Sequence, residues 1–267
     1  GMGGYTAPAV FERLNAKVVE LYFELDGTFP NHEANPIEPA NLVDLQKAVK
    51  KHKADIGLAF DGDADRCFLV DEKGALVNPS ALTALIATRE LAKNPGASII
   101  YNLISSRAVK EVVEENGGTA IRSRVGHSYI KKQMAETNAV FGGEHSGHFY
   151  FRDFWRADSG MLAALYALAE LMATSKPLSN LLKPYNRYFS SGEINSKVKD
   201  AKKSINMIRE KYQGSFEVDE LDGLTISADT WWFNLRPSNT EPLLRLNVEA
   251  NTEKQMTEIR DTVLDLI

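Results

Sequence analysis

The chain has 267 residues, an apolar share of 43% and a formal net charge of −5. This length and apolar content suit two or three domains with separate cores. The negative balance and the lack of a dense basic run argue against general binding to nucleic acid or to an anionic membrane, and leave small anions as possible ligands. The longest apolar stretch, residues 161–173, is interrupted by Glu170 and is too short to span a bilayer.

The cysteine content indicates the cellular compartment. Cys67 is the only cysteine and cannot form a disulfide within the chain. Because no signal-peptide pattern opens the sequence either, we expect a reducing, cytoplasmic environment and a free structural thiol.

Helices and strands are expected to alternate in the first part of the chain. We expect Thr6 to be the N-cap of the first helix and Pro8 to lie in its first turn. The pattern then predicts a strand over 18–23, a polar loop, a helix over 42–52 and a strand over 55–60. This alternation of helices and strands is typical of an α/β domain, and here it begins partway through one of the repeating helix–strand units.

The alternation resumes from Asn78 and predicts a second α/β domain. After an apolar helix, the segment over 183–193 mixes Pro, Gly and Ser with aromatic residues and is expected to be a hinge. The fold class is therefore two consecutive α/β domains with mixed sheets, the first incomplete, followed by a smaller α+β domain. The expected domain ranges are 1–72, 73–182 and 183–267.

The first chemical cluster is the acidic loop DGDADR, which follows the strand over 55–60. It places Asp61, Asp63 and Asp65 in one tight turn beside Arg66. At a separation of about 5 Å and an effective dielectric constant of about 20, each carboxylate pair would repel by roughly 3 kcal/mol, so a bound cation is expected. Oxygen ligands favour magnesium or calcium. A solvated polar turn is the alternative. An EF-hand loop is disfavoured because Arg66 replaces its glycine and strands flank it.

The second cluster, GGEHSGH, contains Glu144, Ser146 and His148 between glycines. Glycines allow a ligand to approach the backbone, and a carboxylate can accept hydrogen bonds from two neighbouring hydroxyls, so this loop is equipped to bind a sugar. His148, or His127 in the upstream VGHS turn, could exchange protons near neutral pH. Taken alone, a histidine in such a loop is more often a solvated loop residue than a catalytic one, and His145 is assigned to that class.

The third cluster, NLRPSNTEPLLRLNVEA, reads as two strands around a polar loop. Apolar residues alternate with polar ones in the second strand, so Arg245 points away from the core, and Arg236 closes the first strand at the same end. The two arginines can therefore flank Ser238, Asn239 and Thr240, an arrangement suited to a phosphate dianion. A polar hairpin with its arginines paired to neighbouring glutamates is the alternative.

In this order, DGDADR, GEHSGH and RPSNTEPLLR resemble the magnesium, sugar-binding and phosphate-binding loops of the α-D-phosphohexomutase superfamily, in its domains two to four. The final histidine of GEHSGH favours the phosphomannomutase/phosphoglucomutase branch. The resemblance implies that three carboxylates bind magnesium (Asp61, Asp63, Asp65) and that Arg66 steadies the phosphoryl group during its transfer. It also implies that His148 and His127 lie near the reacting oxygens. It also implies sugar contacts (Glu144, Ser146) and contacts to the phosphate that is not transferred (Arg236, Ser238, Asn239, Thr240, Arg245).

Two departures from the family pattern are visible. The first domain, with its phosphorylated serine loop, has no counterpart in these residues. Some relatives also carry a lysine where this chain reads NLISSR, so we expect any corresponding substrate contact to pass to Arg107.

The resemblance implies an enzyme that interconverts mannose 1-phosphate and mannose 6-phosphate, and glucose phosphates as well. It would use Mg²⁺ and hexose 1,6-bisphosphate as activator and intermediate, and we expect this chain to be inactive alone. The expected partners are hexose phosphates, and the expected state is a monomer, with a dimer as the alternative. The rival functions are a non-catalytic sugar-phosphate-binding module and a phosphoglucosamine mutase. A magnesium-dependent phosphatase is disfavoured because no aspartyl nucleophile with the usual second acid is evident.

Overall fold

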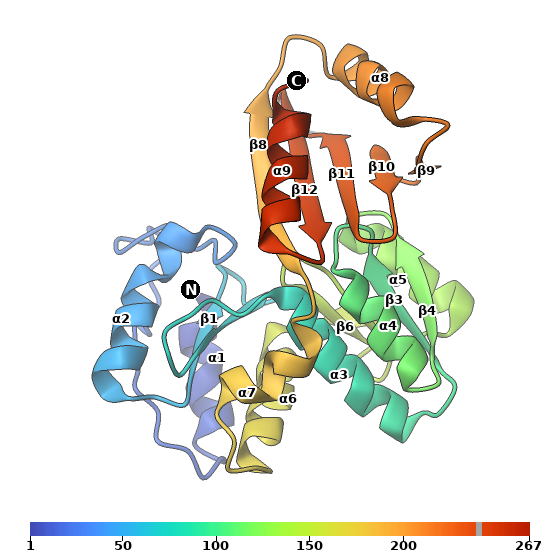
Figure 1. The fold of residues 1–267 in the computed structure, drawn as a ribbon. Coiled ribbons are helices and arrows are strands. Elements are labelled where there is room, and N and C mark those ends of the chain that lie inside the picture. Colours follow the sequence, from blue (N-terminus) through green and yellow to red (C-terminus); the bar gives the residue numbers. More distant parts are fainter. Residues whose placement is uncertain (239–241) are drawn as a thin grey trace.

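A computed structural model describes residues 1–238 and 242–267, and its strands form three separate sheets within those residues. Figure 1 shows the corresponding three units, with the middle one lying below the C-terminal sheet and beside the N-terminal unit. The predicted fold class is confirmed: two α/β units precede a C-terminal α+β unit.

The N-terminal unit is built around an antiparallel hairpin, β1 (Ile56–Phe60) and β2 (Cys67–Asp71). Its helices are α1 (Met2–Phe11), the 3-10 turn Pro39–Leu42 and α2 (Val43–His52). The expected N-cap, Thr6, is wrong. Helix α1 begins at Met2, and the Thr6 hydroxyl lies inside it, donating to the Met2 carbonyl at 3.0 Å.

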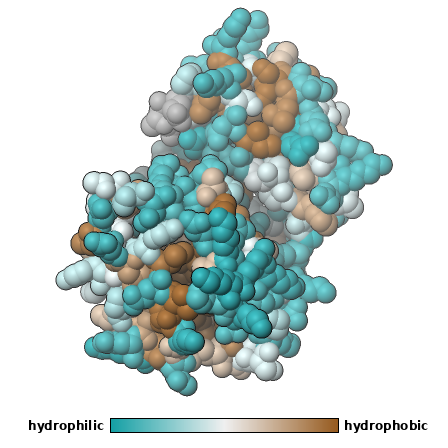
Figure 2. All heavy atoms as spheres, turned by 90° about the vertical axis from the view of Figure 1, so that its left-hand side faces the viewer, coloured by the Kyte–Doolittle hydropathy of each residue, from teal (hydrophilic) through white to brown (hydrophobic). Residues whose placement is uncertain are grey.

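The strand expected over 18–23 does not form; these residues are irregular. A strand needs a neighbour for its backbone groups, and among the described residues the β1–β2 sheet has only two strands. Several apolar side chains of this segment are exposed, including Val18, Val19 and Tyr22. Figure 2 shows the molecule from the side on which the N-terminal unit lies, and apolar residues, in brown, gather over the lower half of this face. Residues 18–23 line a cleft of about 1200 Å³, together with α2, β1 and the end of helix α6 (Gly160–Met172).

The middle unit contains a mixed five-stranded sheet in the order β4-β3-β5-β6-β7. Strands β3, β4 and β5 are parallel, and β6 and β7 are antiparallel additions. Its strands are β3 (Ser98–Asn102), β4 (Thr119–Ser123), β5 (Phe141–Gly143), β6 (Phe149–Phe151) and β7 (Ala157–Asp158). Besides α6, its helices are α3 (Pro79–Lys93), α4 (Arg107–Glu115), α5 (His127–Thr137), α7 (Leu178–Leu182) and the 3-10 turn Lys183–Tyr185.

The C-terminal unit is an antiparallel sheet in the order β8-β12-β11-β10-β9, with helices α8 and α9 lying against one face. Alternation along β11 and β12 explains the two faces. Leu244, Leu246 and Val248 enter the apolar core, while the residues between them form a polar face. The elements are β8 (Phe189–Lys197), α8 (Ala201–Tyr212), β9 (Glu217–Asp219), β10 (Leu224–Ser227), β11 (Trp231–Pro237), β12 (Leu243–Ala250) and α9 (Glu253–Leu264).

The β1–β2 hairpin is fixed against the middle unit. Cys67, a buried free thiol, and Leu69 belong to the same apolar core as α3 and α6. The Cys67 backbone N–H donates to the Gly147 carbonyl at 3.2 Å. Gly160 allows a close approach, because a Cβ there would lie 2.5 Å from the Arg66 carbonyl oxygen. The acidic loop is therefore held beside the GGEHSGH loop.

Candidate active site

The acidic loop joins β1 to β2 and brings three carboxylates together. Asp61, Asp63 and Asp65 each offer an oxygen, and these oxygens lie within 4.8 Å of one another. Asp61 is buried and accepts hydrogen bonds from Arg66, through Nε at 2.7 Å and the backbone N–H at 3.2 Å. Ala64 takes a left-handed conformation, φ 67°, which tightens the turn.

The electrostatics of this loop favour a cation. Burial, together with repulsion from Asp61 and Asp63, raises the pKa of Asp65 to about 7. Burial also opposes ionisation of Asp61, but the hydrogen bonds and charge of Arg66 outweigh it and lower the pKa of Asp61. The Oδ1 atom of Asp65 is buried without a hydrogen-bond partner among the described residues. Carboxylate oxygens whose negative charge is not balanced by neighbouring groups are suitable ligands for a hard divalent cation.

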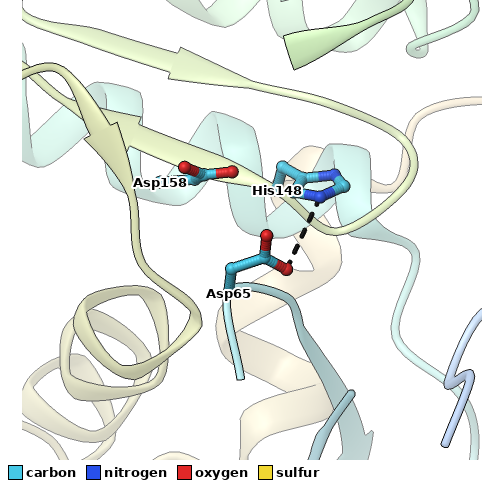
Figure 3. Close-up of side chains that lie close together, drawn as sticks. All are labelled: Asp65, His148 and Asp158. Atoms are coloured by element: carbon cyan, nitrogen blue, oxygen red, sulfur yellow. Dashed lines mark ion pairs between the residues drawn. The ribbon is translucent and has the colours of Figure 1, made fainter. Parts of the chain in front are cut away.

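His148 connects the acidic loop to the GGEHSGH loop. Its Nδ1 lies 2.8 Å from the Ser146 hydroxyl and 3.7 Å from the Glu144 carboxylate, and its Nε2 lies 3.6 Å from Asp65 Oδ1. Figure 3 shows the ring turned toward Asp65. Burial lowers the pKa of His148, although the neighbouring carboxylates of Glu144 and Asp158 oppose that shift. The neutral ring is favoured, as a proton acceptor requires.

Glu144 is buried and held from three sides. It accepts hydrogen bonds from the Tyr150 hydroxyl at 2.7 Å, the Gly126 backbone N–H at 3.0 Å and the Asn102 amide at 3.4 Å. The Gly126 contact joins this loop to the VGHS turn, where the next residue, His127, is exposed at the start of α5. The predicted sugar-binding residues and the second histidine therefore belong to one neighbourhood.

The two arginines of the third cluster lie together on the polar face of the C-terminal sheet. Arg236 on β11 and Arg245 on β12 are direct cross-strand partners. Arg236 is buried, and burial lowers its pKa. Arg245 donates to the Ser238 hydroxyl at 3.3 Å. The predicted contacts Asn239 and Thr240 lie outside the described residues.

Arg107 holds two units together. Its guanidinium donates to three carbonyls of the C-terminal unit, those of Ala228 at 2.6 Å, Trp231 at 2.9 Å and Asp229 at 3.0 Å. In this conformation those donors are engaged in the contact between units, whereas the sequence led us to expect a substrate contact.

Two residues of the site were missed by the sequence reasoning. Asp158 lies beside Asp65 and His148, with side-chain ligand atoms within 4.8 Å of one another (Figure 3), and pairs with Lys131 at 2.8 Å. Tyr150 supplies the hydroxyl that holds Glu144. Tyr150 could have been noticed as the only hydroxyl in the aromatic strand FYF, but no local signal marks Asp158.

Comparison with known proteins gives matches along nearly the whole chain. Family models of phosphoglucomutase/phosphomannomutase match in order: α/β/α domain II over residues 1–74, α/β/α domain III over 78–188 and the C-terminal domain over 193–266. Among the described residues, no helix is both long and apolar enough to cross a membrane.

Similar proteins bear related names. A phosphomannomutase of Methanocaldococcus jannaschii is 46% identical, over 91% of this chain and 54% of the relative. A phosphomannomutase of Escherichia coli K12 is 42% identical, over 96% of this chain and 57% of the relative. A crystal structure of a phosphoglucomutase/phosphomannomutase family protein from Burkholderia thailandensis is 35% identical and superposes with a TM-score of 0.90, covering 100% of this chain and 58% of that one. The chain thus spans little more than half the length of these proteins.

Proposed function

Because the chain belongs to the phosphoglucomutase/phosphomannomutase family, we propose that it carries the metal, sugar and phosphate sites of an enzyme that interconverts mannose 1-phosphate and mannose 6-phosphate, and also accepts glucose phosphates. One observation supports this best. His148 lies 3.6 Å from Asp65 of the acidic loop and 3.7 Å from Glu144 of the sugar loop, which supports one site for the proposed metal ligand, proton acceptor and sugar contact.

The carboxylates of Asp61, Asp63 and Asp65 would hold Mg²⁺. When bound, the ion would offset the negative charge of the transferring phosphoryl group. Arg66 is fixed by its hydrogen bonds to Asp61 and to the Asn35 side chain at 3.2 Å, and would present its remaining donors to that group. The fit is supported by Asp65 Oδ1, which is buried and accepts no hydrogen bond from any described residue.

Proton transfer is assigned to the two histidines. The Nδ1 of His148 is engaged with the Ser146 hydroxyl, which leaves Nε2, on the side of the acidic loop, to accept a proton from the attacking sugar hydroxyl. His127, exposed beside Gly126, would serve the opposite orientation of the sugar. Glu144 and Ser146 would bind sugar hydroxyls, and Arg236, Ser238, Asn239, Thr240 and Arg245 would bind the phosphate that is not transferred.

The chemical step also needs a covalent phosphate carrier. In the proposed reaction a phosphoserine donates its phosphoryl group, and hexose 1,6-bisphosphate is the intermediate. Two serines close to the site have other tasks: Ser105 donates to the Asn102 side chain at 2.7 Å, and the Ser106 hydroxyl caps α4. We therefore expect these 267 residues to bind hexose phosphates without turning them over.

A binding measurement and an activity assay on the same purified chain test this proposal. Calorimetry with mannose 1-phosphate should show binding of about millimolar strength, because an open site pre-organises little, and Glu144→Gln should weaken it. A coupled assay with catalytic glucose 1,6-bisphosphate should show no turnover. Activity near 1 s⁻¹, the low end for enzymes, would mean that a residue of this chain carries the phosphate. Absence of any hexose phosphate binding would overturn the assigned function.

A further inference from the structure

A carboxylate lies within the proposed phosphate site. Glu193, on the edge strand β8, reaches Arg245 on the neighbouring strand β12 and, beyond it, Arg236 on β11. Its Oε2 accepts a hydrogen bond from Arg236 Nη2 at 2.6 Å, and its Oε1 lies 3.5 Å from Arg245 Nη1. One carboxylate therefore bridges both guanidinium groups, in the way that a bound oxyanion would.

This bridge is largely shielded from water. The side chains of Arg236 and Glu193 are 8% and 20% exposed. Charge interactions are screened less there than at a fully exposed surface. Burial lowers the pKa of the neighbouring His145, and the Glu193 carboxylate opposes that shift. Glu193 therefore acts electrostatically on the sugar loop as well as on the arginines.

The bridge leaves donors available. The Nε atoms of Arg236 and Arg245 are buried and have no hydrogen-bond partner among the described residues. Each guanidinium is thus held through its terminal nitrogens while its Nε donor remains unused, so Glu193 orients both arginines without satisfying all of their donors.

We propose that Glu193 is a positioning residue and an internal counter-anion of the phosphate site. It orients Arg236 and Arg245 before a ligand arrives, and by sharing their charge it weakens the hold on phosphate. This inference rests on the proposed function. In the proposed reaction the bisphosphate must leave the site and return in the opposite orientation. Two arginines whose charge is not partly neutralised would bind this intermediate too tightly and slow that exchange.

The decisive variant is Glu193→Gln, which keeps the size and an accepting oxygen but removes the charge. We expect it to bind inorganic phosphate and mannose 1-phosphate about tenfold more tightly than the unchanged chain, measured by calorimetry. Glu193→Asp keeps the charge and should stay within about twofold of the unchanged chain. Glu210→Gln, on the exposed side of α8, is the matched control and should change nothing.

The outcomes separate the inference from the function on which it rests. A gain of affinity in Glu193→Gln alone supports the counter-anion, since a merely structural loss would not tighten binding. Equal or weaker binding in a folded Glu193→Gln would overturn the inference and leave the proposed function standing. If that variant does not fold, Glu193→Ala takes its place: tighter phosphate binding supports the inference, and equal or weaker binding overturns it. Failure of the unchanged chain and all variants to bind phosphate would overturn both.

Discussion

The Glu249 carboxylate of the C-terminal sheet accepts a hydrogen bond at 3.0 Å from the backbone N–H of Arg107, the first residue of α4 in the middle unit. The same carboxylate accepts from the Trp232 indole at 2.8 Å. Arg107 in turn donates to the carbonyls of the β10–β11 turn. Because a helix N-terminus favours negative charge, Glu249 stabilises the start of α4, while Arg107 donates hydrogen bonds back to the C-terminal unit. The two units are therefore joined by hydrogen bonds in both directions.

Replacing Glu249 by alanine should loosen this contact. The change leaves the Trp232 and Arg107 N–H groups without their acceptor, and each unsatisfied buried donor costs about 1–3 kcal/mol. We expect the free energy of unfolding to fall by about 2 kcal/mol, measured by urea denaturation. Glu210→Ala, at an exposed helical position, should leave it nearly unchanged. Equal stability of both variants would show that the contact is not formed in solution.

The C-terminal unit should move during the reaction, because the phosphate site must close over a sugar held by the middle unit. Opening would have to break the contacts of Arg107, so Arg107→Ala should favour the open form. In an active enzyme containing these residues, X-ray scattering should show a smaller radius of gyration at saturating bisphosphate. Without ligand, Arg107→Ala should have a larger radius of gyration than the unchanged enzyme. Identical profiles with and without ligand would contradict the hinge.

Local sequence patterns predicted those elements whose stability depends on near neighbours. The acidic loop after β1 and the alternation along β12 both appear where the sequence placed them. The strand over 18–23 was wrong because a strand also depends on a pairing partner, which no local pattern reports. Thr6 was wrong as an N-cap because helix α1 begins four residues earlier than its best capping side chain.

Contacts between distant positions could not be predicted. Arg107 and its carbonyl partners are more than 120 residues apart, and nothing near Arg107 in sequence indicates that its guanidinium is engaged there. Glu193 reaches Arg236 from a strand 43 residues away. The sequence could therefore place the arginines on the polar face of their sheet, but not the carboxylate that bridges them.

Magnesium binding should be weak in this chain and should strengthen as the pH rises. Burial and repulsion from Asp61 and Asp63 raise the pKa of Asp65 to about 7, and the metal requires the ionised form. Affinity measured by calorimetry should therefore increase between about pH 5.5 and pH 8, with proton release. Without metal, the stability contributed by this group is present below its ordinary pKa of 3.8 and is lost as the pH rises through about 7.

Asp65→Asn provides the control for this pH dependence. The amide cannot titrate, so its weaker magnesium binding should vary much less over the same interval. Submicromolar affinity of the unchanged chain, without a phosphorylated ligand, would contradict the expected weak site. A pH profile identical in the two proteins would show that Asp65 is not the controlling group.

Choice between mannose and glucose phosphates should be lax. The two sugars differ only at C2, whereas Glu144 and Ser146 are expected to bind the hydroxyls at C3 and C4.

The Tyr150 hydroxyl, fully buried, fixes the Glu144 carboxylate at 2.7 Å. Tyr150→Phe should therefore lower kcat/KM about tenfold for both sugars, without changing their ratio. Steady-state assays of an active enzyme containing these residues can test both points. A preference above about a thousandfold, roughly 4 kcal/mol, would require a direct contact to the C2 hydroxyl. A change of the ratio in Tyr150→Phe would mean that Glu144 itself distinguishes the two sugars.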